Sequence, residues 1–177
     1  PDWHYNISSA LKSTSGKALL LGTTICPVSK NISYGGRKTI DSNAILSPNN
    51  LLQKCNIING NFVVVPNYVF RNVGFLDSYF SHSLGDIDFG LRTISKGLNN
   101  YILPNIIGTC ESNQRLRYDP NSRFIEKIRS LRSPIGLPFT EYLYFNKKHY
   151  GLIKALKFTL GIIISLISPI IYNKIAK

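Results

Sequence analysis

The chain has 177 residues, which is enough for one ordinary domain and too few for two well-packed ones. Hydrophobic residues make up 44% and charged residues 17%, a composition that excludes a disordered chain and a collagen-like fibre. Lysine and arginine total 21 against 9 acidic residues, so the net charge of +12 favours anionic partners such as phospholipid headgroups, nucleotide diphosphates or nucleic acid. Most of this excess falls in residues 111–177, where we expect the basic surface.

Two residue types bear on processing and compartment. The sequence contains no methionine and opens on Pro1, which we interpret as the start of a fragment. The three cysteines form no close pair along the chain, so they fit neither a disulfide framework nor a zinc knuckle. A reducing compartment is the simpler interpretation.

Four segments are predicted in the first 50 residues. A helix is expected over Asp2–Leu11, with apolar residues at helical spacing, and a buried strand from Ala18 toward Val28. The paired glycines in Ser33–Lys38 indicate a tight reversal in a loop. The polar stretch Asp41–Asn50 has no helical or strand pattern.

The middle of the chain alternates strands and helices. A β-branched strand is expected over Gly60–Val65, followed by a short helix over Pro66–Arg71 that ends at Gly74. A second helix is expected over Gly85–Lys96, with Gly97 as its C-terminal stop.

Short strands and one further helix complete the pattern before the C-terminus. Two strands, Tyr101–Leu103 and Ile106–Thr109, are expected on either side of Pro104, and a helix over Ser122–Arg132. Alternation of this kind predicts an α/β architecture with a mostly parallel sheet.

The C-terminal segment differs in kind, because Phe158–Tyr172 carries no charge and lysines flank it on both sides. A helix over about Gly151–Tyr172 is predicted, with a kink at Pro169. The uncharged run covers roughly 22 Å as a helix, short of the ~30 Å hydrocarbon core of a bilayer. We therefore expect an interfacial helix on anionic lipid, the alternative being a helix that packs on the domain or on a partner subunit.

The candidate functional site is Asp86 and Asp88 in the first turn of the predicted helix, with Arg92 one turn further on. Two carboxylates at this spacing can hold an ion, cap the helix or accept a proton. The structural alternative is a cap together with an i, i+4 ion pair between Asp88 and Arg92. Local spacing alone leaves these readings open.

The segment Asn59–Pro104, NGNFVVVPNYVFRNVGFLDSYFSHSLGDIDFGLRTISKGLNNYILP, resembles the C-terminal half of the nucleotide-sugar-binding core of family 2 glycosyltransferases. The order of its parts carries the resemblance. It shows a glycine-containing strand, a proline-led helix, a Gly-Phe-Leu-Asp phrase, a Gly-Asp-x-Asp-Φ-x-x-Arg motif, a glycine-terminated helix and a strand that ends near proline. These parts are Gly60–Val65, Pro66–Phe70, Gly74–Asp77, Gly85–Arg92, Gly97 and Tyr101–Pro104.

The resemblance implies a partial GT-A fold in which this chain supplies the acceptor site and the general base. The nucleotide site and the Asp-x-Asp motif for Mg²⁺ or Mn²⁺ belong to an upstream half, so no metal ligand is assigned here, and that half is an expected partner. Asp86 is then the general base, and Asp88 and Arg92 orient it. Acceptor-binding positions are Asn59, Gly60, Asn61 and His82, of which His82, in a loop, has solvation as its alternative.

These expectations define a domain assignment and a function. Residues 1–120 are assigned to the acceptor-side half of a GT-A domain, and 121–177 to a basic helical extension that contains the membrane-associating helix. The function is that of an inverting glycosyltransferase fragment, which transfers a sugar from a nucleotide-sugar donor to a glycan or lipid-linked acceptor in surface polysaccharide synthesis. It is expected at the cytoplasmic side of the membrane, peripheral or monotopic, without a nucleic-acid partner. The alternatives are a non-catalytic membrane-anchoring subunit and a basic nucleic-acid-binding protein.

Overall fold

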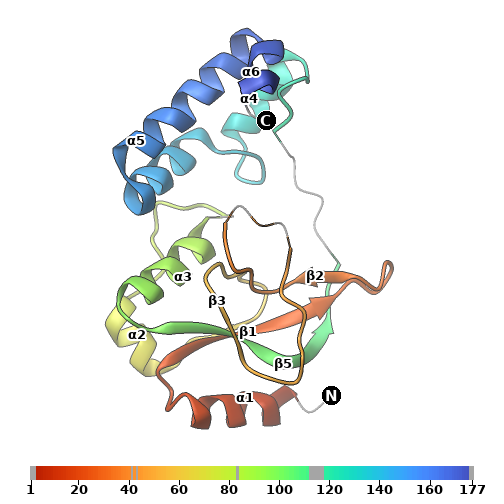
Figure 1. Ribbon diagram of the computed structural model, residues 1–177, viewed down its shortest axis with the longest axis vertical. Coiled ribbons are helices and arrows are strands. Elements are labelled where there is room, and N and C mark those ends of the chain that lie inside the picture. The colour runs from red at the N-terminus through yellow and green to blue at the C-terminus, as the bar shows by residue number, and fades with distance from the viewer. Residues whose placement is uncertain (1–2, 41, 43, 83, 112–117, 176–177) are drawn as a thin grey trace. The chain divides into compact units, whose positions relative to one another are not determined.

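The computed structural model describes residues 3–40, 42, 44–82, 84–111 and 118–175, which form a mixed α/β structure (Figure 1). The chain divides into two compact units, of which the first comprises residues 1–77 and 86–113 and the second residues 78–85 and 114–177. The first unit contains the sheet, and the second contains the C-terminal helices. The assignment of domains to 1–120 and 121–177 stays a prediction.

The sheet of the first unit is mixed, with the strand order β2-β1-β5-β3 and with β4 paired to β1. Its only parallel pairing among the described residues joins β1 (Ala18–Ile25) to β5 (Asn99–Thr109). Antiparallel pairings join β1 to β2 (Ile32–Tyr34) and to β4 (Val63–Val64), and β5 to β3 (Gln53–Cys55). A mostly parallel sheet is therefore not confirmed, because β1 and β2 are joined by a short connection that returns the chain directly alongside.

The sequence predicted that Pro104 would divide the last strand into two, and this prediction is wrong. The expected strands Tyr101–Leu103 and Ile106–Thr109 form one strand, β5, that continues through Pro104. The register with β1 shifts between Leu21 and Thr23, where β5 contributes extra residues. This irregularity accommodates a residue that has no N–H to donate to the ladder.

Helices cover both faces of the sheet. The central strand β1 is buried and alternates between two clusters, with Leu19 and Leu21 in one and Leu20 in the other. Helix α1 (Trp3–Ser13) packs through Ala10 on the Leu20 side, whereas α2 (Asn67–Val73) and α3 (Gly85–Ser95) lie on the opposite side of the sheet (Figure 1). The sheet is thus the middle layer of an α/β/α arrangement.

Helix boundaries follow the glycines and prolines of the sequence. Helix α2 (Asn67–Val73) starts after Pro66 and ends at Gly74, whose φ is +84°. Helix α3 (Gly85–Ser95) is followed by Gly97 at φ +76°. Both glycine stops are confirmed, since a positive φ costs glycine little and other residues more. The predicted start of α1 at Asp2 lies outside the described residues.

The second unit contains α4 (Phe124–Arg132), α5 (Phe139–Ile167) and α6 (Pro169–Ile175). Helix α5 is not one straight rod, because Gly151 has φ +84° and ψ 176° and interrupts it. The ring of Phe158 stacks on Phe139 and Tyr142, with ring centroids 5.8 and 5.9 Å apart. The two arms of α5 therefore fold back against each other. The predicted break near Pro169 is confirmed, since Ser168 is non-helical and separates α5 from α6.

A row of apolar side chains remains exposed along the second arm of α5. Its members recur at spacings of three and four residues, so they share one side of the helix. Helix α5 is long and apolar enough to allow association with a membrane. The exposed row, which we call the apolar row, consists of Leu152, Leu156, Leu160, Ile163 and Ile167.

Cysteine reactivity offers a test of the core of the first unit. Burial raises the pKa of the Cys55 thiol from 9.0 to about 12, so its thiolate fraction near pH 8 is about a thousandfold below that of an ordinary thiol. Cys110 is half-buried, and we expect iodoacetamide to modify it in the native protein while Cys55 stays unmodified. Peptide mass spectrometry after timed alkylation measures both, and alkylation in denaturant is the control. Equal rates at the two sites in the native protein would contradict this packing.

Candidate functional site

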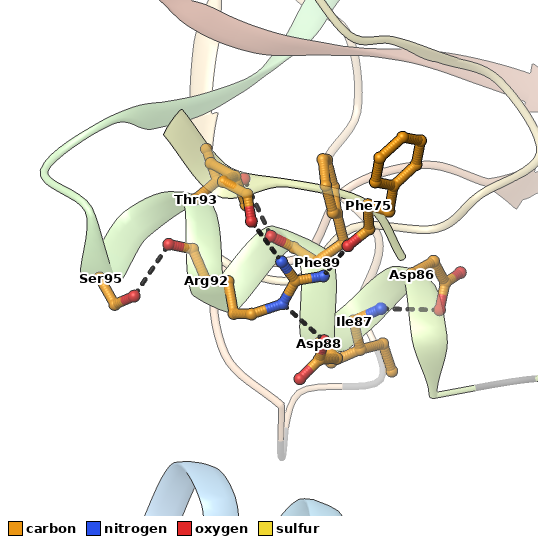
Figure 2. A network of polar contacts seen from close by, with 9 residues as sticks. Phe75, Asp86, Ile87, Asp88, Phe89, Arg92, Thr93 and Ser95 are labelled. Atoms are coloured by element: carbon orange, nitrogen blue, oxygen red, sulfur yellow. Dashed lines mark hydrogen bonds and ion pairs between the residues drawn. The ribbon is translucent and has the colours of Figure 1, made fainter. Parts of the chain in front are cut away.

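Asp86 lies in the first turn of α3 and accepts two backbone hydrogen bonds. Its Oδ1 accepts from the N–H of Ile87 at 2.7 Å (Figure 2), and its Oδ2 accepts from the N–H of Gly60 at 2.7 Å. The second bond joins residues 26 positions apart in the sequence. Both bonds and the start of the helix favour the charged carboxylate, because N–H donors and the helix dipole stabilise negative charge.

The partner of Asp86 is a turn formed by Asn59, Gly60 and Asn61. The Oδ1 atom of Asn59 accepts from the N–H of Asn61 at 3.2 Å, which closes a side-chain turn around Gly60. A Cβ atom at Gly60 would lie 3.3 Å from the Cβ of Asp86, closer than most such contacts. The absence of a side chain at position 60 thus lets the turn approach the carboxylate. We call these four residues, Asn59, Gly60, Asn61 and Asp86, the turn–carboxylate site.

Asp88 and Arg92 form a second polar group on the same helix. Asp88 is fully buried, and its Oδ2 accepts from Nε of Arg92 at 2.8 Å. The other guanidinium nitrogens of Arg92 donate to the carbonyl oxygens of Val73 and Phe75, both at 2.7 Å (Figure 2). This confirms the i, i+4 ion pair expected from the spacing. Arg92 thus joins α3 to the end of α2 and to Phe75 beyond it, so its observed contacts are structural ones.

The predicted site residues therefore fall into separate groups. The structure brings Asp86 together with the turn at Gly60, and it places Asp88 with Arg92 in the buried ion pair. His82 is exposed and lies in the segment 78–85, which belongs to the second unit.

Two further side chains at these segments were not predicted from the sequence. Nδ2 of Asn61 donates to Sγ of Cys110 at 3.5 Å, which connects the turn to the residue after β5. In the second unit, the buried Glu141 accepts from both the N–H and the hydroxyl of Ser81. Each pair is distant in sequence, and no motif spacing signals such contacts. Glu141 fixes the segment that contains His82.

Both carboxylates, Asp86 and Asp88, accept hydrogen bonds from donors of the first unit. Asp88 is directed to a guanidinium, and both oxygens of Asp86 already accept backbone N–H bonds. Across the described ranges of the chain, no group of three or more His, Cys, Asp or Glu residues is arranged to hold a metal ion. The Mg²⁺ or Mn²⁺ expected for a complete enzyme thus has no fitting ligand set among these residues.

The turn–carboxylate site has the chemical capacity of a weak general base. Asp86 is half-buried, and a carboxylate oxygen can accept more than one hydrogen bond. A hydroxyl group that donates to it would lie against the backbone of the turn.

Comparison with protein-family models, with curated protein sequences and with solved structures gives no match to this chain.

Proposed function

We propose that this chain is the acceptor-side half of an inverting glycosyltransferase with a GT-A fold, with Asp86 as its general base. The observation that carries the proposal is the hydrogen bond from the Gly60 N–H to Asp86, which joins two parts of the family-like segment at one exposed site. A mere helix cap needs no partner 26 residues away in sequence. The resemblance to family 2 glycosyltransferases supports the same assignment from the order of the motifs.

The proposed reaction needs one proton acceptor on the acceptor side. The acceptor hydroxyl donates to Asp86, and its oxygen attacks the anomeric carbon of the nucleotide sugar. The new C–O bond forms as the bond to the nucleoside diphosphate breaks, and the hydroxyl proton passes to the carboxylate. Asn59 and Asn61 flank this position with amide groups that can bind further hydroxyls of a sugar or glycan acceptor. The role of Asp86 does not depend on where a metal ion is held.

The isolated chain offers a direct test of whether a second half is needed to bind the nucleotide sugar. We expect purified residues 1–177 not to turn over a sugar nucleotide, because the resemblance assigns the nucleotide contacts to another half. Addition of a nucleotide-binding half, as a longer chain or a companion chain, is expected to give turnover. The assay is release of nucleoside diphosphate from a panel of donors, with and without a glycan acceptor. Turnover by residues 1–177 alone would contradict the assignment.

We further propose that the second unit attaches the protein to the cytoplasmic face of a membrane as a monotopic element. The arm 152–167 covers roughly 24 Å, which is shorter than the ~30 Å hydrocarbon core. Its exposed apolar row suits insertion parallel to the surface, and Lys147 and Lys148 are exposed for contact with anionic headgroups.

Vesicle binding tests this attachment. Substitution of Leu156, Leu160 and Ile163 by glutamine is expected to reduce flotation with anionic vesicles at least tenfold, because three exposed apolar side chains are lost from the inserted face. The matched control replaces Val28 and Leu51, two exposed apolar residues of the first unit, by glutamine as well. It is expected to float like the unchanged protein. Equal flotation of all three proteins would contradict attachment through the apolar row.

A further inference from the structure

The second unit contains a cavity of about 610 Å³ that neither the proposed transfer reaction nor the apolar row uses. The volume is in the range of pockets that hold small molecules. Its lining comes from both arms of α5, from α6 and from the segments before α4 and α5. The lining includes Lys154, Lys157, Phe158, Gly161, Ile162 and Tyr172.

The wall of the cavity is mainly apolar. Phe158 and Ile162 lie on the second arm of α5, and Leu137 and Ile175 come from segments distant in sequence. Gly161 faces the same space, since a Cβ atom there would meet only the ring of Tyr172 at 3.8 Å. A hydrocarbon chain is the chemical group that such a wall accepts without leaving polar atoms unpaired.

Two lysines give the same cavity a positive charge. Lys154 and Lys157 line it, both are exposed, and neither forms an ion pair within the described part of the chain. No acidic side chain occurs among the lining residues that the structure describes. An ammonium group on a flexible stem can meet an anionic group while its methylenes cover apolar surface.

We propose that this cavity binds a single-chain anionic amphiphile, a long-chain alkyl or prenyl phosphate, with the hydrocarbon between the arms of α5 and α6 and the phosphate at Lys154 and Lys157. The charge complementarity and the apolar wall together specify this occupant. An uncharged alcohol satisfies only the wall, and inorganic phosphate satisfies only the lysines. The proposal concerns the second unit alone and does not depend on the glycosyltransferase assignment.

The test measures how well each ligand displaces cis-parinaric acid, a fluorescent fatty acid, from the protein of residues 1–177. Every ligand is kept below its critical micelle concentration. Dodecyl phosphate is expected to displace the probe with 1:1 stoichiometry, dodecanol at least fivefold more weakly, and inorganic phosphate not at all. Strong displacement by inorganic phosphate would overturn the proposal in favour of a simple anion site, and equal displacement by dodecanol would overturn the headgroup assignment.

Three variants locate the binding. Gly161→Leu fills the cavity and is expected to abolish probe binding without lowering the melting temperature, because leucine favours the helix more than glycine does. The double variant Lys154→Gln and Lys157→Gln is expected to weaken dodecyl phosphate about five- to tenfold and to leave dodecanol unchanged. Lys12→Gln, at an exposed lysine of the first unit and outside the cavity, is the matched control. Unchanged probe binding in a folded Gly161→Leu protein would show adsorption on the apolar row instead and would overturn the proposal.

Discussion

Replacement of Asp86 by asparagine is expected to lower sugar transfer by roughly 10²–10⁴-fold in a protein that contains both halves of the enzyme. Asparagine keeps the size of the side chain and one oxygen that can accept the Gly60 or the Ile87 N–H, so the turn stays close to α3. It removes the ability to take a proton. Initial rates at saturating donor, together with the melting temperature of the same samples, measure the two effects separately.

The structural alternative for Asp86 predicts a different pattern. A residue that only caps α3 and holds the turn costs about 1 kcal/mol of stability when replaced, and turnover stays nearly unchanged. Glu111→Gln is the matched control, since Glu111 is exposed and lies in the same unit. It is expected to alter neither quantity. A well-folded Asp86→Asn protein that retains the turnover of the Glu111→Gln control would remove Asp86 from the mechanism.

The elements that the sequence predicted well are those with strong local signals. The helix α3 has apolar residues at helical spacing and a glycine stop at Gly97, and the structure places its limits within a residue of the expected ones. The start of β1 at Ala18 follows from a run of apolar residues. In both segments, local pattern and tertiary environment agree, which is why pattern alone sufficed.

Local sequence patterns did not predict which strands pair with one another. Strands β2 and β3 have only three residues each, so their formation depends on the partners β1 and β5. The direction of each pairing depends on how the chain returns, which composition does not encode. The continuation of β5 through Pro104 likewise depends on a register shift shared with another strand.

The sequence identified the residues of the candidate site but not the contacts between them. The motif at Asp86 and the glycine at position 60 were both identified, and their direct hydrogen bond required the folded chain. The Asp88–Arg92 pair followed from helical spacing, whereas the two carbonyl partners of Arg92 did not. The interruption of α5 had a local signal, since a glycine inside a helical pattern costs about 1 kcal/mol relative to alanine. The sequence placed the start of the C-terminal helix at Gly151, where the structure interrupts α5, and it did not predict the helical arm 139–150.

Arg92→Met is expected to lower the free energy of unfolding by about 3 kcal/mol, the lower end of the range for breaking a buried ion pair, because part of the guanidinium remains in contact with water. Asp88 keeps its charge in a fully buried position after the change, and the carbonyls of Val73 and Phe75 lose their donors. Urea unfolding followed by circular dichroism gives the change in stability.

A second substitution separates the cost of the unpaired buried charge from the cost of the lost hydrogen bonds to Val73 and Phe75. The double variant Asp88→Leu and Arg92→Met removes both charges, so we expect it to recover part of the loss, whereas Asp88→Leu alone leaves the partly buried guanidinium without its ion pair. The recovery stays incomplete, because no side chain replaces the hydrogen bonds from Arg92 to the carbonyls of Val73 and Phe75. A single Arg92→Met variant within about 0.5 kcal/mol of the unchanged protein would contradict the structural role assigned to this pair.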